Sequence, residues 1–165
     1  MAYVPFIRDY QPFYIQDEVS CYDTASMWGL VAKSNPYPLL PNPKKPYSND
    51  WKDADGDDEY VDEMFYESQD ISVQFYVRVQ SGSGSELTLR SQIRSFFDFI
   101  NGKEVTIYDS QTGYGRQKVR YAGYSEDSFR RTPSYARAIF TVKFKVNDPL
   151  TQMTYNSGLN RIVTL

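Results

Sequence analysis

Five carboxylates crowd the segment from residue 53 to residue 59 and offer the most obvious chemistry in this sequence. Hard oxygen ligands at nearly alternating positions can converge on a cation such as Ca²⁺. Counted from Asp53, however, the EF-hand positions for glycine and for the bidentate glutamate hold Asp58 and Met64. We therefore favour a solvated acidic turn over a cation site, and we expect no bound metal and no cofactor. The five carboxylates belong to Asp53, Asp55, Asp57, Asp58 and Glu59.

Two other segments could support chemistry. Ser81-Gly82-Ser83-Gly84-Ser85 precedes a predicted helix and could cradle a phosphate at its N-terminus. It lacks the lysine and hydroxyl of a P-loop and the spacing of a dinucleotide fingerprint, so a flexible connector is favoured. Cys21 is the single cysteine and there is no histidine, which excludes a disulfide, a cysteine zinc site and a Ser-His-Asp triad. We expect Cys21 to be a small core residue and the protein not to be an enzyme.

The elements that position these segments are clearest between Ile71 and Leu150. Apolar residues alternate with polar ones from Ile71 to Val79, as in a strand with one buried face. A helical stripe follows, formed by Leu89, Ile93, Phe96, Phe97 and Ile100. Three further strands are predicted at Glu104–Tyr108, Gln117–Tyr124 and Tyr135–Val146, and Pro149 stops the last run. This order predicts a mainly β fold with one packed α-helix, of the α+β class.

The first seventy residues follow a different pattern. Residues 1–17 have spaced aromatics without a helical or strand period, so we expect an N-terminal arm. Val19–Lys33 is predicted as one long or two short strands. Prolines at 36, 38, 41, 43 and 46 mark a long loop, which favours a binding loop over simple disorder. The predicted organisation is an arm (1–17), a single β domain (18–150) with an inserted loop (34–66), and a C-terminal tail (151–165).

Composition indicates contacts with other protein chains. The net charge is −3, from 18 basic and 21 acidic residues, which argues against nucleic acid as the main partner. No apolar run is long enough to span a membrane. Fifteen Tyr and 10 Phe exceed the need of one small core, and tyrosine and arginine are enriched at interfaces. For the arginines, a solvated sheet face is the alternative. The candidate subunit contacts are Tyr3, Phe6, Tyr10, Phe13, Tyr37, Tyr47, Trp51, Arg116, Arg120 and Arg137.

The order of several short motifs carries a resemblance to a known family. These are Tyr22-Asp23-Thr24 with Met27-Trp28-Gly29-Leu30-Val31, a proline-rich turn, Asn49-Asp50-Trp51 with Asp55-Gly56, and a final strand that closes in Val146-Asn147-Asp148-Pro149. Over roughly residues 20–150 the sequence resembles the distal tail proteins of long-tailed bacteriophages and the related tail-hub proteins of the tail-tube fold family. The resemblance implies a β-sandwich or barrel flanked by a helix and assembled as a six-fold ring.

Two functions follow as expectations. In the first, the chain is a structural component of the virion tail, assembled in the host cytoplasm, whose ring joins the tail tube to the tail tip or baseplate. Its partners would be copies of itself and other tail proteins, with DNA only as cargo of the channel. In the second, it is a monomeric carbohydrate- or ligand-binding β-domain that uses Tyr and Trp51 as stacking platforms. Because the chain stops soon after Pro149, we expect no carbohydrate-binding-like second domain.

Overall fold

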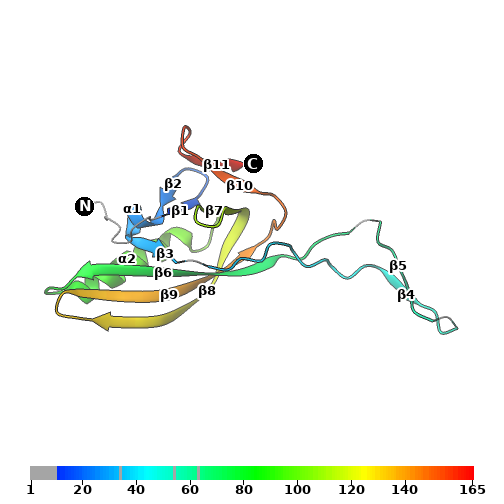
Figure 1. Ribbon diagram of the computed structural model, residues 1–165, viewed down its shortest axis with the longest axis horizontal. Coiled ribbons are helices and arrows are strands. Elements are labelled where there is room, and N and C mark those ends of the chain that lie inside the picture. The colour runs from blue at the N-terminus through cyan, green and yellow to red at the C-terminus, as the bar shows by residue number, and fades with distance from the viewer. Residues whose placement is uncertain (1–10, 34, 54, 63) are drawn as a thin grey trace.

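The structure is a computed structural model that describes residues 11–33, 35–53, 55–62 and 64–165. Figure 1 labels its elements in chain order. They are β1 (Phe13–Gln16), β2 (Cys21–Asp23), α1 (Thr24–Trp28), β3 (Leu30–Ala32), β4 (Ser48–Asp50), β5 (Asp57–Glu59), β6 (Gln69–Gln80), α2 (Ser85–Ile100), β7 (Glu104–Asp109), β8 (Tyr114–Arg131), β9 (Tyr135–Val146), β10 (Met153–Asn156) and β11 (Arg161–Thr164).

Within the described residues, seven strands form one antiparallel sheet in the order β2-β1-β7-β8-β9-β6-β3. β8 is the longest strand, with 18 residues, and it pairs with β7 near its start and with β9 along most of its length. Register shifts interrupt its pairing with β9 between Tyr121 and Gly123 and between Glu126 and Ser128. Such bulges bend a strand and increase its twist. The sheet therefore curves, so that the β1 and β7 part lies over the β9 and β6 part (Figure 1).

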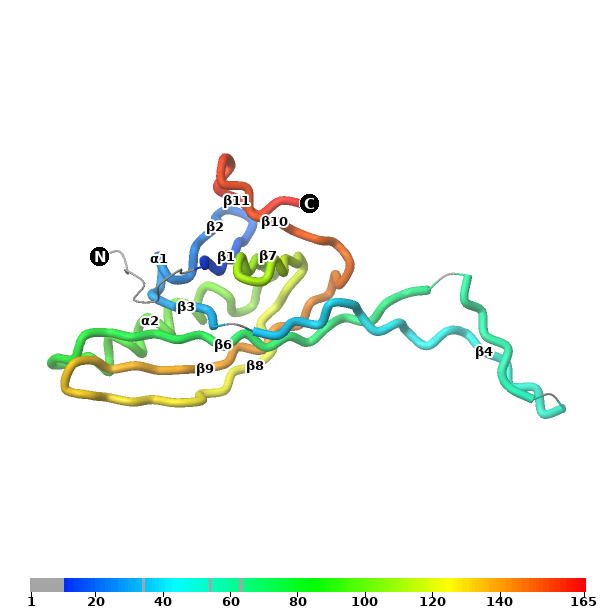
Figure 2. The backbone as a smooth tube through the Cα atoms, in the orientation of Figure 1, coloured from blue at the N-terminus to red at the C-terminus, as the bar shows by residue number. Residues whose placement is uncertain are grey.

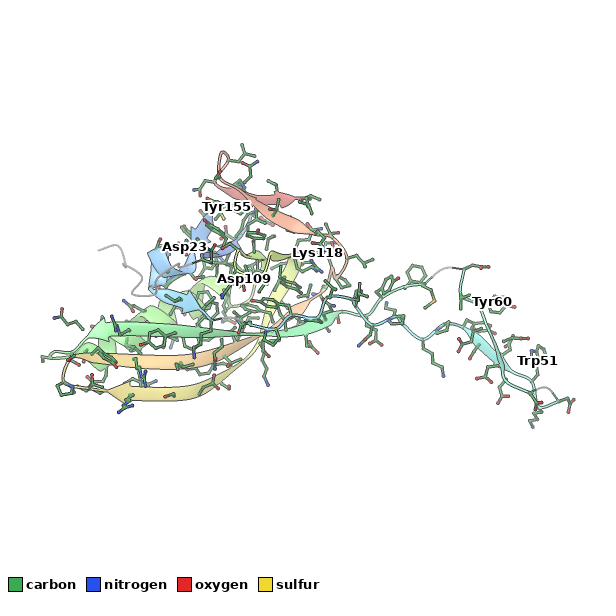
Figure 3. All side chains as sticks on the ribbon, in the orientation of Figure 1. Asp23, Trp51, Tyr60, Asp109, Lys118 and Tyr155 are labelled. Atoms are coloured by element: carbon green, nitrogen blue, oxygen red, sulfur yellow. The ribbon has the colours of Figure 1, made fainter. Side chains whose placement is uncertain are left out.

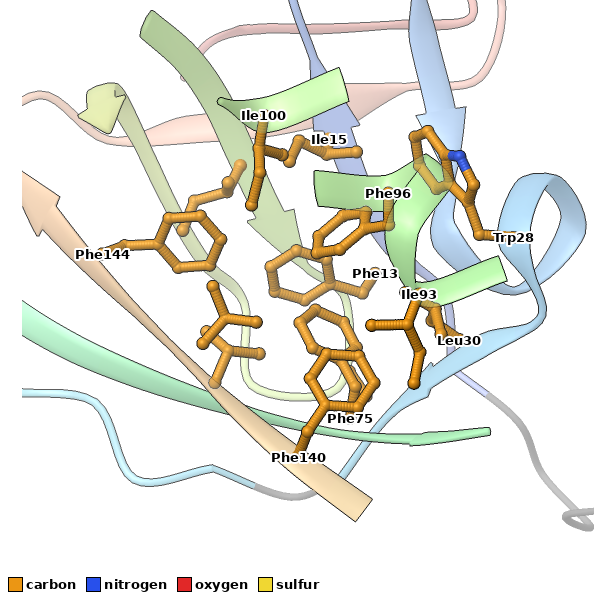
Figure 4. Close-up of a cluster of buried hydrophobic side chains, with 14 of the residues drawn as sticks. Phe13, Ile15, Trp28, Leu30, Phe75, Ile93, Phe96, Ile100, Phe140 and Phe144 are labelled. Atoms are coloured by element: carbon orange, nitrogen blue, oxygen red, sulfur yellow. The ribbon is translucent and has the colours of Figure 1, made fainter. Parts of the chain in front are cut away.

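The core lies inside this curve and is closed by α2. Leu89, Ile93, Phe96 and Ile100 are buried along one face of the helix. Phe96 makes edge contacts with Trp28 and Phe75, at 5.2 and 5.4 Å between ring centroids. Figure 4 shows these rings gathered with Phe13 and Phe140 between the strands and the helix. The predicted helix and its buried stripe are confirmed, with Phe97 half-buried at its edge. The mainly β fold class is confirmed as well.

The N-terminal part of the chain differs from the prediction. Residues 13–16 form β1, which pairs with β2 and β7 inside the sheet. This part of the expected N-terminal arm (residues 1–17) therefore belongs to the domain. Phe13 is fully buried and meets Phe75 edge to face, which corrects its assignment to a subunit contact. Between β2 and β3, the expected strand is interrupted by α1. The Asp23 carboxylate accepts a hydrogen bond from the Ala25 N–H, and Gly29 ends this short helix at φ 73°.

The C-terminal residues also pack on the domain. β10 and β11 form a hairpin, which places Met153 and Ile162 in buried positions. The Gln16 side-chain amide accepts a hydrogen bond from the Ile162 N–H (2.7 Å) and donates one to the Ile162 carbonyl (3.2 Å). Tyr14 and Tyr155 stack at 3.7 Å between ring centroids. The expected C-terminal tail is therefore a structured hairpin, held to β1 by buried polar contacts.

We expect Phe96→Ala to lower the free energy of unfolding by about 3–5 kcal/mol, because it removes a fully buried ring and leaves a cavity among other aromatic side chains. Arg94→Ala on the exposed face of α2 is the control, and its effect should stay within about 0.5 kcal/mol. Denaturant unfolding measures both. An unchanged unfolding midpoint for Phe96→Ala would contradict this account of the core.

Candidate functional site

The segment Asn42–Glu67, which we call the arm, leaves the domain as a long two-stranded extension. Backbone hydrogen bonds join its two sides, from the Glu67 N–H to the Asn42 carbonyl (2.8 Å) and from the Lys44 N–H to the Phe65 carbonyl (2.7 Å). Pro43 and Tyr66 form a β-bridge at its base, and β4 pairs with β5 toward its tip. Figure 2 shows both sides of the arm running together away from the sheet. Most of the expected loop 34–66 is therefore an ordered projection.

Large apolar side chains on the arm are exposed to solvent. The exposed fractions are 70% for Tyr47, 58% for Trp51, 62% for Tyr60 and 65% for Phe65. Figure 3 shows Trp51 and Tyr60 far from the body of the domain. Soluble monomers rarely expose such a concentration of apolar surface, and large patches of this kind mark interaction sites. The arm is therefore the strongest candidate for a functional surface on the described residues.

The tip of the arm, residues 50–53 and 55–59, combines this apolar surface with negative charge. The carboxylates of Asp53, Asp57, Asp58 and Glu59 are exposed, and the β4–β5 register places Asp50 directly opposite Asp57. Like charges directly opposite one another destabilise a strand pair. The Trp51 indole N–H donates a hydrogen bond to the Asp58 carboxylate at 3.1 Å. Among the residues that the structure describes, no group of three or more acidic or cysteine side chains is placed to hold a metal ion.

The root of the arm is fixed to the domain by aromatic stacking and a buried hydrogen bond. The rings of Tyr37 and Tyr114 stack, with centroids 4.3 Å apart and planes at 8°. The Tyr37 hydroxyl donates to the Asp109 carboxylate at 2.7 Å. Burial raises the pKa of Asp109, whereas the hydrogen bond from Tyr37 opposes this rise. Burial, together with the nearby charge of Asp109, also raises the pKa of Tyr37. A carboxylate that is only 1% exposed thus depends on Tyr37 for one of its hydrogen bonds.

Asn35 and Arg116 complete the root. The Asn35 side-chain oxygen accepts a hydrogen bond from the Gln74 N–H at 2.9 Å, so the chain that enters the arm is tied to the middle of β6. Arg116 is 3% exposed, donates to the Gly115 carbonyl at 2.8 Å and lies over the Tyr114 ring at 4.6 Å from its centroid. These contacts hold Arg116 inside the domain, which corrects its assignment to a subunit contact.

The other predicted contact residues lie on different surfaces. Tyr3, Phe6 and Tyr10 lie outside the described residues. Tyr47 and Trp51 lie together on the arm, whereas Tyr37 belongs to its root. Arg120 is exposed on β8, opposite Glu104 on one side and Lys145 on the other. Arg137 is half-buried on β9, between Arg78 and Arg130 of the neighbouring strands. Among the described residues, the structure places Tyr47 and Trp51 on the arm, and it places Tyr37 and Arg116 on either side of Tyr114 at the root.

Sequence reasoning missed Asp109, Asn35 and Tyr114 as residues that position the arm. Asp109 is 72 positions from Tyr37, and neither residue belongs to a motif that would point to the other. The one indication of this contact in the sequence was the position of Asp109, an acidic residue directly after the predicted strand Glu104–Tyr108. Cys21, expected in the core, is half-buried on the edge strand β2, and burial raises its thiol pKa. In the described part of the chain, neither helix is long and apolar enough to cross a membrane.

Comparison with solved structures gives a likeness of fold. No family model and no curated protein sequence matches this chain. The chain is similar to the crystal structure of the SPP1 Dit protein, described as a paradigm of the hub adsorption apparatus in phages that infect Gram-positive bacteria. The TM-score is 0.57 at 16% sequence identity, over 83% of this chain and 50% of the other. This chain thus spans about half the length of that Dit chain, and the two share a fold.

We expect Tyr37→Phe to lower the free energy of unfolding by about 1.5–3 kcal/mol at pH 7, because the ionised Asp109 carboxylate loses a hydrogen bond in a buried site. The folded protein keeps the Asp109 proton to a higher pH than the unfolded chain, since burial raises the pKa. As the pH falls through this raised pKa, the carboxyl becomes neutral and the loss should shrink to about 1 kcal/mol.

Denaturant unfolding at pH 7 and at pH 4 measures this difference, and Tyr47→Phe is the matched control because its hydroxyl lies on an exposed side chain. The control should change stability by less than about 0.5 kcal/mol at either pH. An equal loss for Tyr37→Phe at both pH values would show that Asp109 does not depend on this hydroxyl.

Proposed function

We propose that this chain is a structural component of a bacteriophage tail, a distal tail or tail-hub protein that forms a ring and joins the tail tube to the tail tip or baseplate. The observation that carries the proposal is the arm, an ordered projection on which the described residues Tyr47, Trp51, Tyr60 and Phe65 are exposed. The fold shared with the SPP1 Dit protein supports the proposal that this chain is part of a phage tail. The virion tail, assembled in the host cytoplasm, is the proposed location.

The arm supports a closed ring because each copy then has two different contact surfaces, its arm and its body. A head-to-tail contact uses the arm of one copy and the body of the next, and such contacts close into a ring when the rotation between copies allows it. We propose six copies, in keeping with the resemblance to distal tail proteins. Each pair of neighbours should bury more than about 1,600 Å² in total, the size of a stable specific interface. The tail tube and the tail tip or baseplate are the proposed axial partners, and DNA passes through the channel as cargo.

One observation favours the alternative of a monomeric carbohydrate- or ligand-binding domain. The Trp51 ring is exposed while its N–H is held by Asp58, an arrangement that could present a flat face to a sugar. The same ring equally suits a protein contact, since tryptophan is enriched among the side chains that dominate interface energies. The two functions differ in the mass of the protein in solution. The ring requires stable association, and the alternative does not.

Replacing residues 44–65 by a short glycine-serine linker should give a folded domain that no longer assembles. Pro43 and Tyr66 already pair across the base of the arm, so a short flexible linker can join them. The replacement keeps Tyr37, whose contacts with Asp109 and Tyr114 belong to the root. Light scattering at tens of micromolar gives the mass, and a cooperative thermal melt verifies the fold.

A second pair of variants tests whether association depends on the apolar side chains of the arm or on exposed apolar side chains in general. Trp51→Ala and Tyr60→Ala together should weaken association, whereas Val19→Ala and Leu150→Ala, at exposed positions on the body, should not. If the shortened chain forms the same assembly at the same concentration, the arm does not join the copies. If the full chain remains a monomer and no ring occurs in the parent particle, the proposed function is wrong.

A further inference from the structure

A groove between α2 and β8 has a composition that matches the tip of the arm. Its volume is about 360 Å³, and its lining residues are Arg90, Ile93, Arg94, Phe97, Tyr121 and Tyr124. Phe97 contacts Tyr121 and Tyr124 edge to face, at 5.2 and 5.1 Å between ring centroids. The groove thus has an aromatic floor beneath two guanidinium groups. A ligand that suits it carries both a flat apolar side chain and carboxylates.

We propose that this groove is the docking site for the arm tip of a second copy of the chain, with Trp51 on the aromatic floor and the neighbouring carboxylates at the two arginines. The proposal rests on the proposed function, because it names the surface that receives the arm in the assembly.

The charges of the two surfaces are complementary. At the tip, the Asp50 and Asp57 carboxylates face each other across β4 and β5 and repel, so an approaching cation relieves a cost that the isolated arm carries. In the groove, Arg90 lies 3.3 Å from Glu126 and Arg94 lies 3.2 Å from Asp98, with exposed side chains. Exposed ion pairs of this kind contribute little to stability, so the arginines can turn to an incoming carboxylate at small cost.

The position of the groove requires that the arm come from another molecule. The arm joins the sheet where β6 begins, whereas α2 follows the end of β6, after twelve strand residues and the short connector. Figure 1 shows the arm and the β8–β9 turn at opposite ends of the longest axis of the protein. An arm that points away from its own groove can fill the groove of a neighbour. This head-to-tail contact is the type that a closed ring needs.

A second cationic surface is the competing docking site. Across β8, β9 and β6, the strand registers place Arg130, Arg137 and Arg78 side by side. They lie on the sheet face opposite α2, because their neighbours in sequence, Arg131 and Ala136, point toward the helix side. This row offers positive charge to the acidic tip. The groove offers positive charge together with an aromatic floor for Trp51, which is why we favour it.

Chemical cross-linking between two single-cysteine variants distinguishes the two surfaces. Both chains carry Cys21→Ser, one has Lys52→Cys beside Trp51, and the other has Asp98→Cys beside Arg94. The matched control replaces Asp98→Cys with Ser128→Cys, which lies on β8 two positions from Arg130. Full-length chains are mixed, treated with a short bismaleimide and mapped by peptide mass spectrometry. The proposal predicts a 52–98 link and no 52–128 link; a 52–128 link without a 52–98 link would place the tip on the arginine row and overturn it.

Charge exchange gives an independent readout. Arg90→Glu with Arg94→Glu should raise the concentration at half assembly by about tenfold or more, and so should Asp55→Arg with Asp57→Arg. All four changes in one chain should recover most of that loss, because the reversed charges attract again. Losses that simply multiply would show that the two surfaces do not meet. Thermal melts of each variant separate an assembly defect from unfolding.

The outcomes also separate this inference from the proposed function. If the full chain assembles, loses assembly when residues 44–65 are replaced, and yet gives neither the 52–98 link nor recovery on charge exchange, the groove is wrong and the ring proposal stands. If the full chain does not associate and gives no intermolecular link at all, both are wrong.

Discussion

The pairing of β6 with β9 sets the positions of the core, the arm and α2. Each strand has twelve residues, and the register runs unbroken from Gln69 opposite Val146 to Gln80 opposite Tyr135. Ile71, Val73, Phe75 and Val77 thereby share the core face with Phe144, Val142, Phe140 and Ala138, and a slip of one residue would turn either set to the opposite face. The same ladder holds the arm at one end of β6 and leads into α2 at the other. Core packing and the separation of arm from groove therefore have one cause.

In the proposed assembly, the arm costs the isolated chain some stability and gains a contact with a neighbour. A hairpin of two three-residue strands is marginal by itself, and this one also carries facing carboxylates and exposed aromatic rings. Its root is firmly held, with Tyr37 stacked on Tyr114 and bonded to buried Asp109. A fixed root reduces the conformational freedom that the tip loses on docking, which favours association. These features fit the proposed assembly, in which the arm is buried between copies.

The parts of the fold that sequence reasoning predicted are those with long periodic patterns. The alternation from Ile71 to Val79 and the stripe from Leu89 to Ile100 each repeat often enough to specify an element. β1, α1 and the β10–β11 hairpin are too short to show a period, and contacts distant in sequence hold them, such as those of Gln16 with Ile162. At the candidate site, the prolines indicated an extended segment; Tyr47 and Trp51 are exposed on it, and their role as subunit contacts stays a prediction. Arg116 and Phe13 were misplaced because exposure depends on tertiary partners, here the Gly115 carbonyl with the Tyr114 ring, and Phe75.

We propose that copies of this chain bind head to tail through the arm and close into a ring. Electron microscopy of the purified full-length chain at tens of micromolar, together with its native mass, decides whether such rings form. The account predicts rings of uniform diameter with six-fold symmetry and a mass of six chains, with neighbouring copies joined where one chain's arm reaches the α2 side of the next. A single species with the 19.2 kDa mass of one chain, with no ring in either the isolated protein or the parent particle, would contradict the account.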